Sequence, residues 1–368
     1  MKTNRPLRVA TLFSGIGAFE HSLDRLDISH EIVFACDIDK YCKESYFANY
    51  NISEKNWYWD IKDIKGKKYL GKIDILIGGS PCQSFSMVGK RKGLEDDRGN
   101  LVFEFIRIIK ETQPNTFIFE NVRGLLSHNE GKTWEDIEKR FKKLGYSFSK
   151  KVLNARDYGI PQNRERIFLV GFKDKTIKFD FPNPVPLQIT VQDLLEDNPK
   201  SKYFLGEKGI NFVTKEKNIK KKYTQINGDI ALCQKANQQF NWHGDFILDS
   251  PKKDVEKKYY LSEKTKKYVL KSGTKSFYSK PKTDLEIARP LLTTMHKMHR
   301  AGIDNYITKG KRIRKLTPRE CHRLMGFSDS YKIVVSDTQA YKQAGNSIVV
   351  PVIMNILNNI DLEKIKNE

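Results

Sequence analysis

The chain has 368 residues, which allows one large domain or up to three ordinary ones, and its 39% hydrophobic content excludes a wholly disordered protein. Lys and Arg number 66 against 45 Asp and Glu, and the net charge of +21 favours a polyanionic partner, most simply nucleic acid. No apolar stretch is long enough for a membrane span, and no signal core follows the N-terminus, so we expect a cytoplasmic protein. Five Cys, an odd number without a CxxC pair, argue against a disulfide framework and a zinc site, and we expect no metal.

Apolar runs alternate with segments of helical spacing through the first third of the chain. Strands are expected at 7–13, 31–36, 73–77 and 116–119, and helices at 19–26 and 101–110. This alternation indicates parallel βαβ units, and therefore an α/β fold whose sheet is covered on both faces. In such sheets, ligands bind beyond the carboxyl ends of the strands.

The composition changes after a further expected strand at 167–171. A proline-rich segment covers 181–186, and residues 201–282 hold 19 Lys, no Arg and eight acidic residues, interleaved with aromatic side chains. Lysines among aromatic residues suit phosphates and exposed bases, although a small domain with a lysine rim would have the same composition. Regular patterns return after about residue 308. Thr317, Pro318 and Glu320 are typical of a helix start, and 349–360 is a candidate helix.

Polar and glycine-rich clusters follow several of the predicted strands. Phe13 to Gly17 (FSGIG) ends the first strand and opens a helix, where glycines let the backbone approach a ligand. Asp37 follows the second strand, where an acid can accept hydrogen bonds from ribose hydroxyls. Together they favour an adenosine-containing cofactor.

A second group of residues is suited to chemistry on a substrate. Cys82 follows a strand and a Gly-Gly pair, which makes it a candidate nucleophile. Glu120 follows the strand at 116–119, which is expected to neighbour the strand before Cys82, so its carboxyl group could lie beside Cys82. Arg164 and Arg166 lie two apart in an extended segment, so they would point to the same side and could clamp a phosphate or a carbonyl group.

These motifs resemble those of the DNA (cytosine-5)-methyltransferase family, of the bacterial or phage restriction-modification type. Six of them occur in the order typical of that family: FSGIG at 13–17, PCQ at 81–83, ENV at 120–122, QNRER at 162–166, RKLTPREC at 314–321 and GNS at 345–347. The resemblance covers residues 7–171 and about 289–360. It leaves unmatched the basic middle segment, the part in which the family varies its target recognition.

The resemblance implies a Rossmann-like, S-adenosylmethionine-dependent methyltransferase sheet with a smaller, mixed target-recognition domain. It implies a catalytic and cofactor-binding domain at 1–180, a target-recognition domain at 181–309 and a C-terminal part at 310–368 that returns to the catalytic domain. Catalytic roles fall to four residues. Cys82 would add to carbon 6 of cytosine, Glu120 would contact ring N3 and Arg166 the carbonyl oxygen, while Arg164 would contact a phosphate or position a neighbour.

The same resemblance implies the cofactor site and the DNA contacts. S-adenosylmethionine, which becomes S-adenosylhomocysteine, would be held by Phe13, Gly15, Gly17, Asp37, Ile38, Asp60, Ile61, Leu101, Asn346 and Val349. A flipped cytosine is required, because its carbon 5 cannot be reached inside a duplex. Double-stranded DNA would be contacted by Ser86, Lys90 and Arg91 in a glycine- and cation-rich loop, and by Thr293, Thr294, Lys297 and Arg300.

The wider context is also expected from the resemblance. Methylation would protect host DNA from a cognate restriction endonuclease that acts separately on the same sequence, and the enzyme is expected to be a monomer. Three alternatives stay open. The first is a tRNA cytosine-5 methyltransferase, whose branch typically has a second proline where Ser80 stands here. The others are a non-catalytic nucleic-acid-binding module and a nicotinamide oxidoreductase with a similar sheet.

Overall fold

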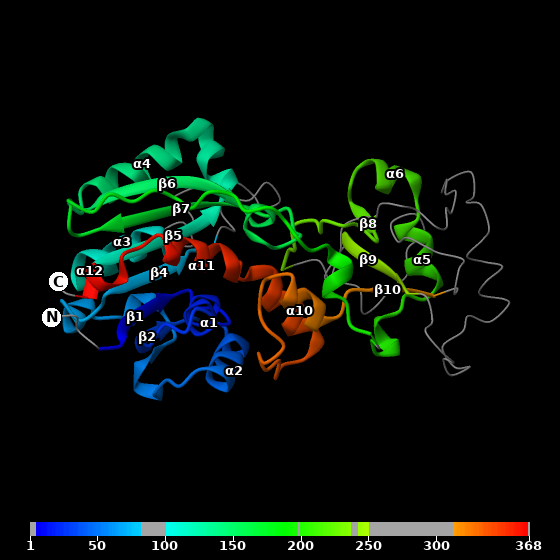
Figure 1. The fold of residues 1–368 in the computed structure, drawn as a ribbon, viewed down its shortest axis with the longest axis horizontal. Helices are drawn as coiled ribbons and strands as arrows, with labels where there is room; N and C mark the ends of the chain where they lie inside the picture. The colour runs from blue at the N-terminus through cyan, green and yellow to red at the C-terminus, as the bar shows by residue number, and fades with distance from the viewer. Residues whose placement is uncertain (1–4, 82–100, 198, 237–241, 250–311, 367–368) are drawn as a thin grey trace. The chain divides into compact units, whose positions relative to one another are not determined.

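A computed structural model describes residues 5–81, 101–197, 199–236, 242–249 and 312–366 (Figure 1). The chain divides into two compact units. The first comprises Met1–Asn154, Glu165–Val185 and Ile348–Glu368, and the second comprises Ala155–Arg164 and Pro186–Ser347. Within these described ranges, no helix is both long and apolar enough to cross a membrane.

This division differs from the predicted domain boundaries. Residues 310–347, expected to return to the catalytic part, group with the second unit. Hydrogen bonds explain the grouping: the Glu196 amide donates to Glu320 Oε1 at 2.7 Å, and Gln162 Nε2 donates to the Leu324 carbonyl at 2.8 Å. The first unit is therefore closed by the last part of the chain, from Ile348 onward.

A seven-stranded sheet forms the centre of the first unit, with the strand order β3-β2-β1-β4-β5-β7-β6 (Figure 1). Its strands are β1 (Leu7–Leu12), β2 (His30–Cys36), β3 (Trp57–Tyr58), β4 (Ile75–Gly79), β5 (Thr116–Val122), β6 (Ser147–Asn154) and β7 (Glu165–Phe172). The predicted α/β class is confirmed, and the expected parallel units are present in β1 to β5, within a sheet that is mixed. β7 runs antiparallel to both β5 and β6, because the connection at 155–164 contains no crossover helix and simply reverses the chain.

Helices cover this sheet because their apolar residues recur with helical spacing. The helices of the first unit are α1 (Ala18–Arg25), α2 (Lys40–Asn49), α3 (Leu101–Thr112), α4 (Lys132–Lys142), α11 (Val350–Asn358) and α12 (Leu362–Lys366). Phe105 of α3 and Phe141 of α4 are fully buried, with ring centroids 5.3 Å from Phe119 and 5.5 Å from Phe117, respectively. Burying each such side chain contributes about 1.5–3 kcal/mol. α11 packs on α1, where Ser22 Oγ donates to the Val350 carbonyl.

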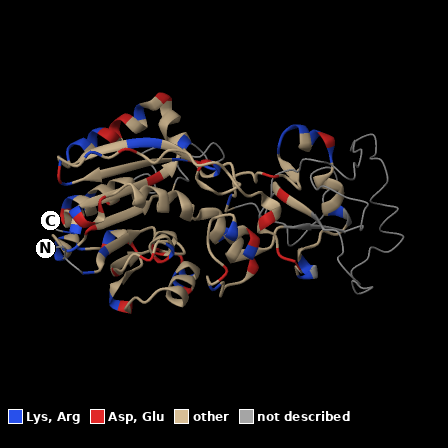
Figure 2. Ribbon diagram, viewed as in Figure 1, with Lys and Arg blue, Asp and Glu red and all other residues tan. Residues whose placement is uncertain are grey.

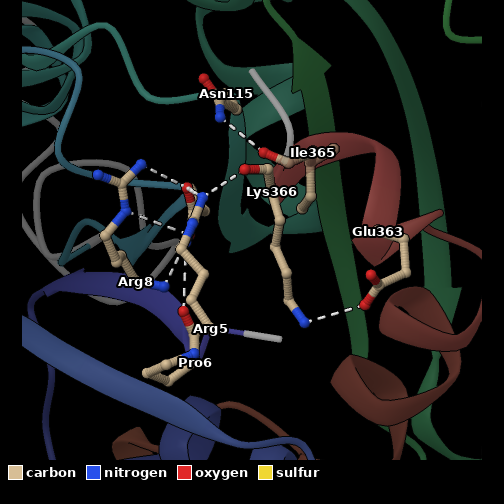
Figure 3. A network of polar contacts seen from close by, with 8 residues as sticks. Arg5, Pro6, Arg8, Asn115, Glu363, Ile365 and Lys366 are labelled. Carbon is tan, nitrogen blue, oxygen red and sulfur yellow. Dashed lines mark hydrogen bonds and ion pairs between the residues drawn. The ribbon is translucent and has the colours of Figure 1, made fainter. Parts of the chain in front are cut away.

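A network of charged residues joins the two ends of the chain at the amino edge of the sheet (Figure 3). The buried Asp74 carboxylate accepts from Arg8 at 2.8 Å and also from Arg5. Arg5 donates in addition to the Lys366 carbonyl, and Asn115 Nδ2 donates to the Ile365 carbonyl at 2.6 Å. The guanidinium groups therefore compensate a buried carboxylate, and β1, β4 and α12 are tied together away from the carboxyl ends of the strands.

The second unit holds a three-stranded sheet of order β10-β9-β8, in which β8 and β9 are parallel and β10 is antiparallel to β9. Its elements are α5 (Glu207–Val213), α6 (Glu216–Lys220), β8 (Thr224–Ile226), β9 (Gly244–Asp249), β10 (Arg312–Lys315), α9 (Pro318–Arg323) and α10 (Asp337–Asn346). Trp242 is fully buried against Phe212. The predicted helix start is observed. The Thr317 side chain caps α9, and the Glu320 carboxylate accepts from the Thr317 amide at 2.8 Å.

Candidate active site

The turn from Phe13 to Gly17 connects β1 to α1 and is bonded to the end of β2. The Ser14 amide donates to the Cys36 carbonyl at 2.9 Å, and the Cys36 amide donates to Ser14 Oγ at 2.9 Å. Gly17 has a φ of 78°, and a Cβ there would lie 2.1 Å from a ring carbon of Tyr50, so only glycine fits. Phe13 itself has a φ of 53°, a backbone conformation that is frequently found at functional sites.

Asp37 lies at the carboxyl end of β2 with its carboxylate directed at this turn. Its Oδ2 accepts from the Gly15 amide and its Oδ1 from the Asp39 amide, each at 2.8 Å. The side chain is half-buried. The glycine turn and Asp37, predicted separately from the sequence, are therefore brought together.

The end of β3 lies beside Asp37 through the register of β2 and β3. The Asp37 amide donates to the Tyr58 carbonyl at 3.1 Å, and Asp60 caps the following short helix by accepting from the Lys62 amide. Ile38 is 78% exposed and Trp59 is 45% exposed, whereas Ile61 is buried in the core. The sequence did not single out Trp59. The signal for it was its position directly before Asp60.

A buried carboxyl group beneath the glycine turn was also missed. Glu20 is fully buried, its Oε1 accepts from Thr11 Oγ1 at 3.0 Å and from the Tyr46 hydroxyl, and Thr11 Oγ1 is 2.7 Å from Ser14 Oγ. Burial raises the pKa of Glu20 above its usual value, although its hydrogen bonds to Tyr46 and Thr11 oppose the shift. The network connects α1 and α2 with the floor of the turn.

Glu120 and Arg166 form the other half of the site. Arg166 Nε lies 3.1 Å from Glu120 Oε1, and both side chains are largely buried. They are diagonal neighbours on one face of the sheet, since Glu120 pairs with Phe168 and Val122 with Arg166. Gly79 pairs with Glu120, and a Cβ on Gly79 would lie 2.7 Å from Glu120 Oε2. The glycine at the end of β4 therefore makes room for the carboxylate.

The ends of β4 and β5 are also joined by a buried side-chain bond. Asn121 Nδ2 donates to Ser80 Oγ at 3.0 Å and to the Ser80 carbonyl at 3.2 Å. Ser80 is buried and lies two residues before Cys82 in the chain. This contact fixes the backbone that leads to the predicted nucleophile.

Arg164 and Arg166, which were expected to act together, belong to different units of the chain. Arg164 belongs to the second unit, is 3% exposed, and donates to the carbonyls of Gln234 at 2.7 Å, Gly345 at 3.1 Å and Ser347 at 2.8 Å. Both terminal nitrogens are engaged with backbone, so the guanidinium ties together parts of the second unit. The expectation that Arg164 contacts a phosphate or positions a neighbour stays a prediction, and a phosphate ligand would have to displace these buried bonds.

The other predicted site residues fall into three groups. Leu101 begins α3 and Val349 caps α11, both in the first unit. Asn346 is exposed at the end of α10 in the second unit. The residues outside the described part of the chain are Cys82, Ser86, Lys90, Arg91, Thr293, Thr294, Lys297 and Arg300.

A known protein family and several relatives match nearly the whole chain. The sequence model of the family described as C-5 cytosine-specific DNA methylase matches residues 7–362. The orphan methyltransferase M.SPRI of Bacillus phage SPR is 31% identical over 96% of this chain and 97% of its own. The type II methyltransferase M.HhaI of Haemophilus parahaemolyticus is 34% identical over 96% of this chain and 94% of its own.

Solved structures show the same fold at lower identity. A mutant of Spodoptera frugiperda DNMT2 superposes with a TM-score of 0.66 at 21% identity, covering 98% of this chain and all of its own. A putative DNA modification methyltransferase from an Escherichia coli prophage gives a TM-score of 0.59 at 22% identity, over 98% of this chain and all of its own. The family match spans nearly the whole sequence, and the chain therefore belongs to the family of C-5 cytosine-specific DNA methylases, which methylate carbon 5 of cytosine in DNA.

Proposed function

We propose that this chain is a sequence-specific DNA cytosine-5 methyltransferase that uses S-adenosylmethionine and a covalent bond between Cys82 and the target cytosine. The observation that carries the proposal is the ion pair of Glu120 with Arg166 beside Gly79. It holds an acid and a cation at the sheet edge where β4 and β5 end. Cys82 follows the end of β4 by three residues in the sequence.

The residues at the ends of β1, β2 and β3 fit an adenosine-containing methyl donor. Around a Cβ built on Gly15, only the Phe13 carbonyl oxygen comes within 4 Å, so the turn leaves room for a ligand. Asp37 is oriented by two amides and can accept from ribose hydroxyls, while the exposed Ile38 and Trp59 offer apolar surface to an adenine ring. When bound, S-adenosylmethionine supplies an electrophilic methyl group.

Cys82 starts the reaction by adding its thiolate sulfur to carbon 6 of cytosine, because carbon 5 of the free base is a poor nucleophile. As the carbon–sulfur bond forms, electrons move toward ring N3 and the carbonyl oxygen. Glu120, protonated as the adduct forms, donates a hydrogen bond or a proton to N3, and Arg166 donates to the carbonyl oxygen. Their ion pair orients both groups before the base arrives.

The addition leaves carbon 5 nucleophilic and able to accept the methyl group. A base then removes the carbon 5 proton, the electron pair of that bond restores the ring double bond, and Cys82 leaves as a thiolate. In this scheme Glu120 takes the proton back from N3 as the ring recovers its aromatic state. The chain's own residues thus supply covalent activation and charge stabilisation.

The target cytosine is expected to leave the duplex, since carbons 5 and 6 are otherwise covered by stacked neighbours. We assign target recognition to residues 181–309, whose lysine-rich segment suits the phosphate backbone. Methylation at a fixed sequence would protect host DNA from a cognate restriction endonuclease. The names of the relatives, both orphan and type II methyltransferases, support this class of role.

Methylation of a random-sequence DNA duplex library, followed by sequencing of the modified cytosines, tests the proposal. Wild-type protein is expected to modify carbon 5 within one short sequence, and Cys82→Ser is expected to modify none while still binding S-adenosylhomocysteine. A tRNA preparation serves as the competing substrate. Modification of tRNA in place of DNA, or full activity of Cys82→Ser, would overturn the proposal.

A further inference from the structure

The second unit carries a group of lysines and aromatic rings at the adjacent starts of β8 and β9. We call Lys217, Lys221, Lys222, Tyr223 and His243 the lysine–aromatic patch. Lys217 belongs to α6. Lys221, Lys222 and Tyr223 connect α6 to β8, and His243 directly precedes β9. The Gly244 amide donates to the Tyr223 carbonyl at 3.0 Å, which joins the two segments.

The positive charge of this patch is not neutralised within the described part of the chain. Lys217, Lys221 and Lys222 are exposed, and none has an ion pair with an acidic side chain there. The neighbouring Glu216 pairs instead with Lys220, whose Nζ lies 3.3 Å from Glu216 Oε1. α4 differs, because its Lys142 and Arg140 pair with acids one turn away, and Figure 2 shows Lys, Arg, Asp and Glu mixed along it. As far as the described residues are concerned, these three adjacent cations are therefore available to an external anion.

The aromatic part of the patch is ordered and partly exposed. The rings of Tyr223 and His243 stack with centroids 4.8 Å apart and an interplanar angle of 16°, and Lys221 Nζ lies 5.9 Å from the Tyr223 centroid. Tyr223 remains 42% exposed. The tyrosine is thus held by its ring, and its hydroxyl can donate to an oxygen outside the protein.

The backbone holds these side chains in one arrangement. Lys222 and Trp242 have φ angles of 52° and 38°, in the left-handed region that non-glycine residues seldom adopt. The Tyr223 amide donates to the Asn218 carbonyl at 3.0 Å, and the buried Trp242 anchors the other segment against Phe212. Strained conformations persist where surrounding contacts fix them, frequently at binding sites.

We infer that the lysine–aromatic patch binds the phosphodiester backbone of the DNA substrate, through the three lysines and the Tyr223 hydroxyl. Lysines and tyrosine hydroxyls are common partners of DNA phosphates. The inference rests on the proposed function. It narrows the phosphate contact expected of the lysine-rich segment to named residues that the structure describes.

The test compares two triple variants that remove the same charge. Lys217, Lys221 and Lys222 are changed to Gln in one. In the control, Lys67, Lys72 and Lys110 are changed to Gln; they are exposed and lie near the amino ends of β4 and β5, at the opposite edge of the sheet from the candidate site. The affinity of each for a duplex containing the target sequence is measured by fluorescence anisotropy over a series of KCl concentrations. S-adenosylhomocysteine affinity reports intact folding.

Each lost phosphate contact lowers the slope of log affinity against log salt by about 0.9, so three contacts correspond to about 2.7. The patch variant is expected to approach this loss while the control keeps the wild-type slope, and Tyr223→Phe is expected to weaken binding without changing the slope. Equal slopes for both triple variants, with wild-type protein methylating DNA, would overturn the inference alone. If wild-type protein fails to methylate DNA, the proposed function itself fails.

Discussion

The carboxylate of Glu120 lies against the backbone of Gly79, and this contact shows how closely the proposed catalytic group is constrained. Arg166 holds one carboxylate oxygen, and the missing side chain at position 79 leaves space for the other. A displacement of about 1 Å in such a group can cost about 10²-fold in rate. If Glu120 acts as proposed, the geometry at this residue would therefore set the activity.

Gly79→Ala is expected to lower kcat by about 10²-fold, because the new Cβ would lie 2.7 Å from Glu120 Oε2 and push the carboxylate away from its position. S-adenosylhomocysteine affinity should stay within twofold of wild type. Gly124→Ala is the matched control, since its nearest contact is an ordinary 3.9 Å. Steady-state methylation assays check both, and unchanged kcat for Gly79→Ala would contradict the role given to Glu120.

Trp59→Ala is expected to raise the KM for S-adenosylmethionine roughly 2- to 12-fold, the loss of an aromatic contact of about 0.5–1.5 kcal/mol. The effect should fall on KM and leave kcat near wild type, because Trp59 would touch the adenine and not the reacting atoms. Leu70→Ala removes another exposed apolar side chain from the same unit and should change neither constant. A wild-type KM for Trp59→Ala would remove this residue from the cofactor site.

At the scale of elements, the turn between β1 and α1 rests on a buried carboxyl group. The pKa of Glu20 is raised in the folded protein, so the unfolded chain loses its proton first as the pH rises. The stability contributed by protonated Glu20 is therefore greatest below pH 4.5 and declines toward its folded pKa.

Glu20→Gln, which keeps the shape and cannot ionise, should make Tm less sensitive to pH above 4.5. The expected result is a smaller fall in Tm than wild type shows between pH 4.5 and 8, measured by scanning calorimetry. Thr11 and Tyr46 would still bond the amide oxygen. Parallel profiles for the two proteins would mean that Glu20 titrates alike in both states.

α9 holds a buried group, His322, whose neutral form is also favoured by burial but whose pKa is lowered. Burial lowers the pKa of His322 to about 4, although its bond with the Pro318 carbonyl opposes the shift. Between pH 6.5 and pH 4 the histidine is protonated in the unfolded chain but neutral in the folded protein. The free energy of unfolding therefore decreases, by up to about 3 kcal/mol, as the pH is lowered through this range. His322→Phe should flatten Tm over this range. A profile as steep as that of wild type would contradict the assignment.

The sequence anticipated the elements with clear apolar patterns and not those set by tertiary contacts. β1, β2, β4, β5, β7, α1, α3 and α11 follow runs that local pattern reveals. β6 has Lys150 and Lys151 in its middle and forms an exposed edge, so its pattern does not mark it as a strand, and its pairing makes the sheet mixed. Local sequence patterns do not reveal surroundings that are built from residues distant in sequence. This applies to the burial of Glu20 and Arg164 and to the position of Trp59.

For the whole molecule, a net charge of +21 and a candidate site at the carboxyl edge of the sheet indicate the same kind of substrate. A polyanion is attracted by charge over the entire surface, whereas the proposed chemistry would occur only where Glu120 and Arg166 meet. In the proposed mechanism, salt would weaken binding, whereas catalysis would depend on Cys82.

Covalent trapping tests the central claim most directly. A duplex with 5-fluorocytosine at the target position is incubated with protein and S-adenosylmethionine, since fluorine on carbon 5 prevents the proton loss that would release Cys82. The account predicts a stable protein–DNA adduct joined through residue 82 in wild type, and none with Cys82→Ser. Turnover of normal DNA without any adduct on the fluorinated duplex would contradict it.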